Sequence, residues 1–296
     1  MRVHRVQVVR RLPHPGRGFT QGLLAGPDDC VLESTGLYGQ SQLRRYRLGA
    51  DSYEASAILS ADFFAEGICQ VGDSIWQLTW RERTALRWDA ATLELRDLVR
   101  YNREGWGICA IPAGTVPGDA IPGDAPGGDV LTSDGTSELV RRDPETLQPR
   151  EVIRVRCQGE RLRGLNDLAW SVGRVWANVA PTSAIVGIDP RTGDVTDLID
   201  ASAAAEPRMV DPQAIMNGIA ALPRPAEVTG VAGVAGAGGS GASPGAGGSG
   251  RSPGADPGDF LLTGKGWRWL RQVRLVPARG RMEPRRLLEG AGRFFF

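Results

Sequence analysis

The sequence predicts an all-β protein, a five-bladed β-propeller with four antiparallel strands in each blade. A short motif occurs five times, a polar or aromatic residue followed in most copies by Gly and then Leu or Ile. The copies lie about 40 to 50 residues apart once two insertions are set aside, which is the length of one propeller blade. No segment shows the apolar spacing of a helix. The copies are QGL at Gln21, EGI at Glu66, WGI at Trp106, NDL at Asn166 and NGI at Asn217.

Each copy of the motif begins a set of apolar segments of strand length. A second segment follows every copy, as in CVLESTG (30–36) and SIWQLTW (74–80), and third and fourth segments come next. The N-terminal run VHRVQVVRRL resembles a fourth segment. We therefore expect it to pair with the C-terminal strands, which closes the ring and leaves no open sheet edge. An irregular β-sandwich is the alternative.

Two insertions interrupt the pattern without ending it. The first, near 112–128, is rich in Pro, Gly and Asp, and the second, near 223–256, is rich in Gly, Ala, Pro and Ser. Such segments carry too little apolar surface to offset the entropy of ordering them. Because the repeat resumes after each insertion, we expect a single propeller domain over residues 1–296 with two flexible insertions.

The charge pattern argues against several classes of partner. The 296 residues have a formal net charge of +1, and 23% of them are charged. Nucleic-acid and membrane-surface proteins usually show a clustered excess of Lys and Arg, which is missing here. No apolar run is long enough for a membrane span, and the N-terminus lacks the apolar region of a signal peptide. We expect a monomer, cytoplasmic as the sequence stands, that binds neither nucleic acid nor membrane.

The cysteines and histidines are too few and too scattered for a metal centre. Four Cys occur, none in a CxxC pair, and the two histidines are His4 and His14. Zinc-like ligand spacing is therefore absent, and a Ser-His-Asp triad would need a histidine from the extreme N-terminus. We expect buried free thiols, no metal and no cofactor.

A propeller brings equivalent positions of all its blades to one central axis. The first residues of the five motif copies would therefore meet at one end of the innermost strands. The ends of the second strands would join them, namely Thr35, Trp80, Asp134, Ala180 and Lys265. Taken singly, such amides often bond local backbone and such tryptophans often lie in the core. Together, one acid, one Lys, several amides and two Trp are typical of an aromatic-walled pocket for a small ligand.

Nine stretches, in order, carry a family resemblance that touches every predicted blade from about residue 7 to residue 275. They are FTQGL (19–23), ESTGLYGQS (33–41), FAEGI (64–68), QLTW (77–80), GWGI (105–108), SDGT (133–136), LND (165–167), NGIA (217–220) and LLTGKGW (261–267). With these motifs the chain resembles the plant-type glutaminyl-peptide cyclotransferases, also called glutamine cyclotransferases.

The resemblance implies a five-bladed propeller that converts the N-terminal glutamine of peptides or proteins into pyroglutamate and releases ammonia. It implies metal-free catalysis in which the acid of the EG motif, Glu66, shuttles protons. It also implies relatives that often act outside the cytoplasm. The family's pocket residues carry over to Phe19, Gln21, Phe64, Trp80, Trp106, Asn166 and Lys265.

The reaction fits these residue types on chemical grounds. The α-amine attacks its own side-chain amide, so proximity is built in, and one carboxyl group can both take and return the proton. Glu66 then needs a raised pKa, which desolvation by the flanking Phe and Trp residues would supply. Lys265 would oppose that rise, and it would stabilise the developing oxyanion or orient the acid. Trp80 or Trp106 would hold the substrate ammonium by cation–π contact, and the amides of Asn166 and Gln21 would bind its side-chain amide or its peptide carbonyl.

The fourth repeat departs from the family pattern, which is close to Asn-Glu-Leu-Glu with a Trp after a later Ala-Asn-Val. Here LNDLAW reduces the carboxylates to Asp167, and RVWANVA ends in Ala180 without the wall Trp. The alternative function is a non-catalytic propeller that binds peptide N-termini or a protein partner. A metal-dependent propeller hydrolase or lactonase is the third reading, for which the axis offers mainly Glu66 and Asp134.

Overall fold

In the structure, a computed structural model, the regular secondary structure is almost entirely β-strand. The described residues are 1–114, 128–206, 213–222, 258–278 and 283–293. Most of the predicted insertion near 112–128 and all of the tract near 223–256 lie outside these residues. The described helical segments are two 3₁₀ turns, Pro15–Arg17 and Ser202–Ala204, and the single turn α1, Pro284–Leu287. No helix among the described residues has the length and apolarity needed to cross a membrane.

Three sheets each contain four strands that are consecutive in the chain and antiparallel to their neighbours. The first sheet comprises β2 Thr20–Ala25, β3 Cys30–Thr35, β4 Gln42–Arg47 and β5 Ala55–Ile58. The second comprises β6 Ala65–Val71, β7 Ser74–Thr79, β8 Thr84–Asp89 and β9 Leu95–Arg100. The third comprises β10 Ile108–Ile111, β11 Asp129–Ser133, β12 Glu138–Arg142 and β13 Pro149–Arg154.

A larger sheet of eight strands has the order β16-β17-β18-β19-β1-β22-β21-β20. One half comprises β16 Leu165–Ser171, β17 Arg174–Val179, β18 Ala184–Ile188 and β19 Val195–Asp200. The other comprises β1 Arg2–Pro13, β20 Met216–Ala221, β21 Asp259–Gly264 and β22 Trp269–Pro277. The antiparallel pairing of β1 with β22 confirms the prediction that the N-terminal strand joins the C-terminal strands.

The two halves of this sheet meet where Arg2–Arg5 of β1 runs parallel to β19, a pairing that the sequence did not predict. The buried carboxylate of Asp197 lies at this junction. Its Oδ1 accepts hydrogen bonds from Arg2 Nε at 2.8 Å and His4 Nε2 at 2.9 Å. Burial alone would raise the pKa of Asp197, but the bonds from His4 and Arg2 outweigh burial and lower it. These hydrogen bonds to a carboxylate thus anchor the first residues of β1 to the neighbouring strand.

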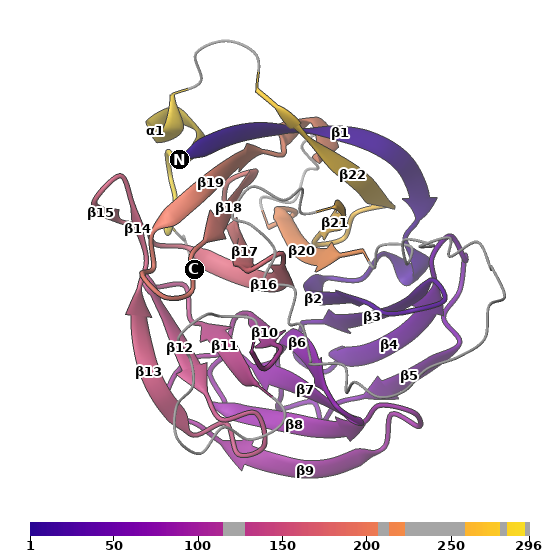
Figure 1. Ribbon diagram of the computed structural model, residues 1–296. Coiled ribbons are helices and arrows are strands. Elements are labelled where there is room, and N and C mark those ends of the chain that lie inside the picture. Colours follow the sequence, from indigo (N-terminus) through magenta and orange to yellow (C-terminus); the bar gives the residue numbers. More distant parts are fainter. Residues whose placement is uncertain (115–127, 207–212, 223–257, 279–282, 294–296) are drawn as a thin grey trace, which may run out of the picture.

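The sheets are arranged around a common centre (Figure 1). Their innermost strands contact one another in the cyclic order β2, β6, β10, β16, β20 and back to β2. Four hydrophobic core clusters draw residues from two neighbouring sheets, as where Leu43 packs with Ile68. A further cluster, with Trp176 and Phe260, joins the two halves of the eight-stranded sheet. The architecture is all-β and propeller-like.

Glycine in the repeated motif permits the innermost strands to approach closely. Gly67 N donates to Trp106 O at 2.7 Å. A Cβ atom placed on Gly22 would lie 2.7 Å from Gly67 Cα, and one on Gly67 would lie 2.7 Å from Gly107 Cα. Because Cβ atoms essentially never approach other atoms so closely, only glycine fits where the backbones meet.

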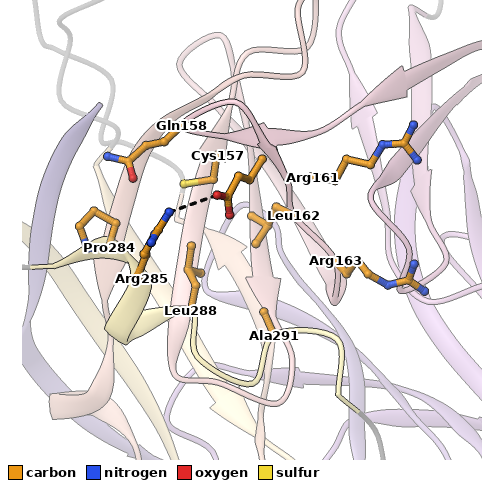
Figure 2. Close-up of a pocket in the computed structure, with 10 residues that line it drawn as sticks. Cys157, Gln158, Arg161, Leu162, Arg163, Pro284, Arg285, Leu288 and Ala291 are labelled. Atoms are coloured by element: carbon orange, nitrogen blue, oxygen red, sulfur yellow. Dashed lines mark hydrogen bonds and ion pairs between the residues drawn. The ribbon is translucent and has the colours of Figure 1, made fainter.

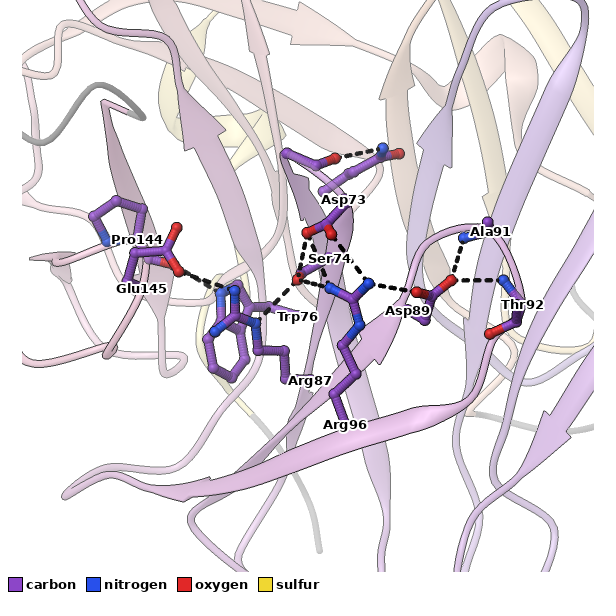
Figure 3. A network of polar contacts seen from close by, with 12 residues as sticks. Asp73, Ser74, Trp76, Arg87, Asp89, Ala91, Thr92, Arg96, Pro144 and Glu145 are labelled. Atoms are coloured by element: carbon purple, nitrogen blue, oxygen red, sulfur yellow. Dashed lines mark hydrogen bonds and ion pairs between the residues drawn. The ribbon is translucent and has the colours of Figure 1, made fainter.

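Polar contacts join neighbouring sheets away from the centre (Figure 3). The indole of the buried Trp76 donates to Pro144 O at 2.8 Å, and Arg87 pairs with Glu145 at 2.9 Å. These contacts connect the second and third sheets, so the indole nitrogen is satisfied although its ring lies in the core.

Candidate active site

A β-bulge near the start of four innermost strands directs the motif side chains away from the regular sheet pattern. In the second sheet Ala65 pairs with Thr79 and Ile68 with Gln77, so one extra residue is accommodated between these pairs. Register shifts of the same kind lie at the start of β2, β16 and β20. Bulges re-aim side chains, and the residues at these irregularities include Gln21, Glu66, Asn166 and Asn217.

The ends of the second strands lie beside these bulges. Trp80 N donates to Phe64 O at 3.0 Å, and Lys265 N donates to Ile215 O at 3.0 Å. In the first sheet the equivalent bond joins Gly36 N to Phe19 O at 2.9 Å. Thr35 is the last residue of β3, as the sequence predicted, and Gly36 directly after it is the position equivalent to Trp80 and Lys265. A side chain is excluded there, because a Cβ on Gly36 would lie 2.4 Å from the Phe64 ring.

Glu66 is almost fully buried, with 5% of its surface exposed. Its Oε1 accepts a hydrogen bond from Gln21 Nε2 at 3.3 Å. Burial raises the pKa of Glu66 well above its usual value, the charge of Lys265 opposes the rise, and the charge of Asp167 adds to it. Desolvation penalises the ionised carboxylate, so the expected direction of the pKa shift is confirmed. The group therefore holds a proton at pH values where an exposed Glu would be ionised.

The side-chain amide of Gln21 is oriented by a second amide. Asn217 Nδ2 donates to Gln21 Oε1 at 2.7 Å and also lies 3.3 Å from Thr20 O. Because Gln21 Oε1 is occupied as an acceptor, its Nε2 group faces Glu66 as a donor. Gln21 and Glu66 are thus brought together as the sequence predicted.

Aromatic rings form a continuous row that includes Phe64, two residues before Glu66 in the chain. The centroids of the Phe19 and Phe64 rings are 6.2 Å apart, and those of Phe64 and Trp80 are 5.5 Å apart, both in edge-to-face contact. The row also includes Tyr38, which the sequence reasoning missed; its ring is 5.4 Å from Phe64. Such geometry is favourable for aromatic pairs, and it places three predicted site residues side by side.

Glu104 joins the two predicted site tryptophans, and the sequence reasoning missed it. Its Oε2 accepts hydrogen bonds from Trp80 Nε1 at 3.0 Å and from Trp106 Nε1 at 3.3 Å. Its position two residues before Trp106 in the motif REGWGI was the available signal. The contact with Trp80 spans different segments of the chain, so spacing alone did not reveal it.

Lys265 is the only lysine in the chain, since the other 34 of the 35 basic residues are arginines. The backbone of Lys265 forms an isolated antiparallel β-bridge with that of Phe19, which connects the first and last motif regions. Its Nζ lies 4.9 Å from the centroid of the Phe19 ring. Because every other basic residue is an arginine, the single lysine in the sequence indicated that this position needs a lysine in particular. A lysine supplies a compact ammonium, which differs in geometry and hydration from a planar guanidinium.

Several buried amide atoms at the fourth and fifth repeats have no hydrogen-bond partner among the described residues. They are Asn166 Oδ1, Asn217 Oδ1 and both side-chain polar atoms of Asn178. The backbone of Asn166 is fixed, since its carbonyl accepts from Ser133 Oγ at 2.8 Å. Buried polar atoms are nearly always satisfied in native proteins, so unpartnered atoms here mark positions for a ligand or water.

Asp167 occupies the motif position that holds glycine in the other repeats, and it ties three innermost strands together. Its Oδ2 accepts hydrogen bonds from Leu23 N at 3.2 Å in β2 and Ile219 N at 2.9 Å in β20. Burial raises the pKa of Asp167 to about 8, although these backbone donors oppose the rise. Its carboxyl group therefore lies among the innermost strands of the ring.

The C-terminal segment 283–293 contacts the fourth repeat at Ala180. Ala180 lacks the large side chain that would form a pocket wall at this position. Gly292 N donates to Ala180 O at 2.9 Å, and a Cβ on Gly164 would lie 2.7 Å from Gly292 N. Leu288 of the same segment packs against the neighbouring core cluster. This contact could not be predicted from the sequence, because the segment lies beyond the recognised motifs.

A cavity of about 480 Å³ lies between this segment and the hairpin of β14, Arg156–Cys157, and β15, Glu160–Arg161. Figure 2 shows Arg161 and Arg163 directed away from Leu288, while Arg285 pairs with Glu160. The site residues named above do not line this cavity.

The sequence model of the glutamine cyclotransferase family matches residues 1–232. The chain belongs to the glutamine cyclotransferase family. A glutaminyl-peptide cyclotransferase of Arabidopsis thaliana is 31% identical over 195 residues, which cover 66% of this chain and 56% of that relative. The chain therefore spans little more than half the length of this curated relative.

Among solved structures, the glutaminyl cyclase of Myxococcus xanthus superposes with a TM-score of 0.72 and 27% sequence identity. The superposition covers 94% of this cyclotransferase-family chain and 99% of the bacterial one. The similarity therefore extends across the ring and includes all the sheets that carry the candidate site.

Proposed function

We propose that the protein is a glutaminyl-peptide cyclotransferase, which converts the N-terminal glutamine of peptides or proteins into pyroglutamate and releases ammonia. The observation that carries the proposal is the setting of Glu66. This carboxyl group is buried, and burial raises its pKa. The charge of Lys265, the only lysine in the chain, acts on it and opposes that rise. Membership of the glutamine cyclotransferase family supports the same activity.

The reaction needs a single proton carrier. The α-amine nitrogen bonds to the side-chain amide carbon, and Glu66 takes a proton from that nitrogen. Glu66 returns the proton to the amide nitrogen, the old carbon–nitrogen bond breaks, and ammonia leaves. A carboxyl group with a raised pKa suits both transfers near neutral pH. Gln21 holds Glu66 Oε1 by its hydrogen bond and so orients the group for transfer.

The remaining site residues would bind and polarise the substrate. Lys265 stabilises the oxyanion of the tetrahedral intermediate, because a positive charge in a poorly hydrated site is worth more than in water. The unpartnered Asn166 Oδ1 accepts an N–H of the substrate. The aromatic faces that enclose the substrate's glutamine side chain and its α-ammonium group come from Phe19, Phe64, Trp80 and Trp106.

We also infer that the sheets make up five blades of one propeller domain. The eight-stranded sheet then represents two four-stranded blades that are joined where β1 runs parallel to β19. The cyclic contacts of the innermost strands support this interpretation. The ring would place the site residues around one end of its axis.

Mass spectrometry of a Gln-initiated peptide after incubation with the purified protein tests the activity. We expect loss of one ammonia, faster than the spontaneous reaction. A peptide with an acetylated N-terminus controls for the mechanism, since its amide nitrogen is a poor nucleophile. If a folded protein binds several Gln-initiated peptides in calorimetry without releasing ammonia, the binding-module alternative replaces the enzyme.

A further inference from the structure

His14 and Glu33 form a fully buried pair that takes no part in the proposed proton transfer. His14 Nε2 lies 2.8 Å from Glu33 Oε1, and neither side chain has exposed surface. His14 Nδ1 lies 2.8 Å from the carbonyl oxygen of Trp267. Both ring nitrogens thus face acceptors, and an imidazole that donates from both nitrogens is an imidazolium. The sequence reasoning had set both histidines aside.

The charges around the pair favour the ionised state. Burial lowers the pKa of His14, but the charge and hydrogen bond of Glu33 outweigh burial and raise it. Burial would raise the pKa of Glu33, yet the charge and hydrogen bond of His14, with the bond from Thr20, lower it. From β4, the charge of Arg44 lowers both values, and the phenol of Tyr46 stays protonated because burial raises its pKa.

The histidine side of the pair holds the turn that carries Lys265. Its bond to Trp267 O fixes the turn two residues after Lys265. Gly266 N donates to Gly18 O at 2.9 Å, and Phe19 forms a β-bridge with Lys265. The turn is therefore attached to Gly18 and Phe19, the two residues directly before β2.

The glutamate side of the pair holds the start of β2. Glu33 Oε1 accepts a hydrogen bond from Thr20 Oγ1 at 2.7 Å. Thr20 directly precedes Gln21, whose amide bonds Glu66. One buried ion pair thus connects the two segments that bring Lys265 and Gln21 to Glu66.

We propose that His14 and Glu33 are a positioning pair, which fixes the Lys265 turn against the start of β2 and so sets Lys265 and Gln21 relative to Glu66. A buried ion pair is seldom the most stable way to fill a core, and its best-attested use is to specify one arrangement. The catalytic consequence of the pair rests on the proposed cyclotransferase function, but its geometric consequence does not.

Two substitutions separate the two bonds of His14. The amide nitrogen of His14→Asn reaches the place of Nδ1 and keeps the bond to Trp267 O, whereas that of His14→Gln reaches the place of Nε2 and keeps the bond to Glu33. His4→Gln is the matched control, because His4 makes a similar bond of 2.9 Å to Asp197 at the other end of β1.

The single lysine supplies a readout that is independent of activity. Protein grown with ¹³C-lysine gives one ¹³Cε resonance, from Lys265. We expect this resonance to shift in His14→Gln, to shift less in His14→Asn, and to stay in place in His4→Gln. In the activity assay we expect kcat to fall about tenfold in His14→Gln, with a smaller change in KM. Melting temperatures establish that each variant is folded.

A titration without any change to His14 keeps the test decisive if its variants do not fold. In the Glu66→Gln protein, which removes the titration of Glu66, the Lys265 resonance should change with pH at the midpoint of the His14 imidazole signal. The proposal is overturned if the Lys265 resonance changes neither during the titration of His14 nor in the His14→Gln protein. If the resonance responds but the wild-type protein releases no ammonia, the positioning pair stands and the cyclotransferase function fails.

Discussion

Gln21 donates its side-chain amide to Glu66 Oε1 over 3.3 Å, from one innermost strand to the next. The two residues hold equivalent positions in successive repeats, so the ring itself brings them together. The bond occupies one oxygen of a carboxyl group whose pKa is raised by burial.

Glu66→Gln should remove the activity and leave the fold intact. General acid–base catalysis is typically worth about 10² to 10⁴ in rate, so we expect kcat to fall by at least about a hundredfold. Because the pKa of Glu66 is raised in the folded state, ionisation of Glu66 destabilises the fold as pH rises. The melting temperature at pH 8 should therefore be equal or higher. The exposed Glu94→Gln is the control, and near-normal turnover of Glu66→Gln would contradict the assignment.

Lys265→Met should move the Glu66 limb of the pH profile to higher pH. The positive charge of Lys265 lowers the pKa of Glu66, so its removal raises that pKa further. The measurement is kcat/KM against pH, which reports groups of the free enzyme. Lys265→Arg keeps the charge and should keep the position of the limb. An unmoved limb in Lys265→Met would mean that Lys265 does not act on this carboxyl group.

Glu104→Ala should weaken substrate binding more than it slows chemistry. The indoles of Trp80 and Trp106 both donate to this one carboxylate, and a lost bond to a charged partner costs about 1.5 to 3 kcal/mol. We expect KM to rise about tenfold or more with a smaller change in kcat. Glu94→Ala, at an exposed turn, is the matched control. An unchanged KM would show that the tryptophans hold their positions without Glu104.

Asp167→Asn should stabilise the protein at alkaline pH. The pKa of Asp167 is raised to about 8 in the folded state, so the unfolded chain loses this proton at a lower pH than the folded protein does. Stability from this group is present at low pH and is lost as pH rises from about 4 to about 8. Asn keeps an oxygen for Leu23 N and Ile219 N and has no charge to bury.

The melting temperature of Asp167→Asn should exceed that of the wild type at pH 9 by at least about 3 °C. The difference should shrink toward pH 5, where the wild-type carboxyl group is protonated in the fold. A constant difference across this range would show that the titration of Asp167 does not contribute.

Gly292→Ala should detach the C-terminal segment from the edge of the fourth repeat. Gly290 and Gly292 both have positive φ angles of 89° and 69°, so alanine strains the backbone similarly at each. A Cβ on Gly292 would lie 2.7 Å from Arg163 Cβ, whereas one on Gly290 meets open space. Hydrogen exchange of residues 283–293 should therefore rise in Gly292→Ala and much less in the control, Gly290→Ala. Equal exchange in both would show that the contact at Ala180 is not what holds the segment.

The sequence by itself determined the strand pattern, the repeat and the residues that gather at one end of the innermost strands. Alternating apolar residues and a motif of fixed length are local properties, and repetition places equivalent residues at equivalent positions. Gln21 and Glu66 were found in this way, without knowledge of any contact. The same reasoning explains the motif glycines, since neighbouring strands of a ring must approach one another.

Only the tertiary structure decided which side chains touch across the repeats. Glu104 reaches Trp80, and His14 reaches both Glu33 and the Trp267 carbonyl, through contacts between distant parts of the chain. Thr35 ends β3 as predicted, but the hydrogen bond from Gly36 N to Phe19 O makes Gly36 the equivalent of Trp80, and the Phe64 ring excludes a side chain there. Sequence periodicity carries no information on such contacts, because they depend on how the sheets pack against each other and not on any single strand.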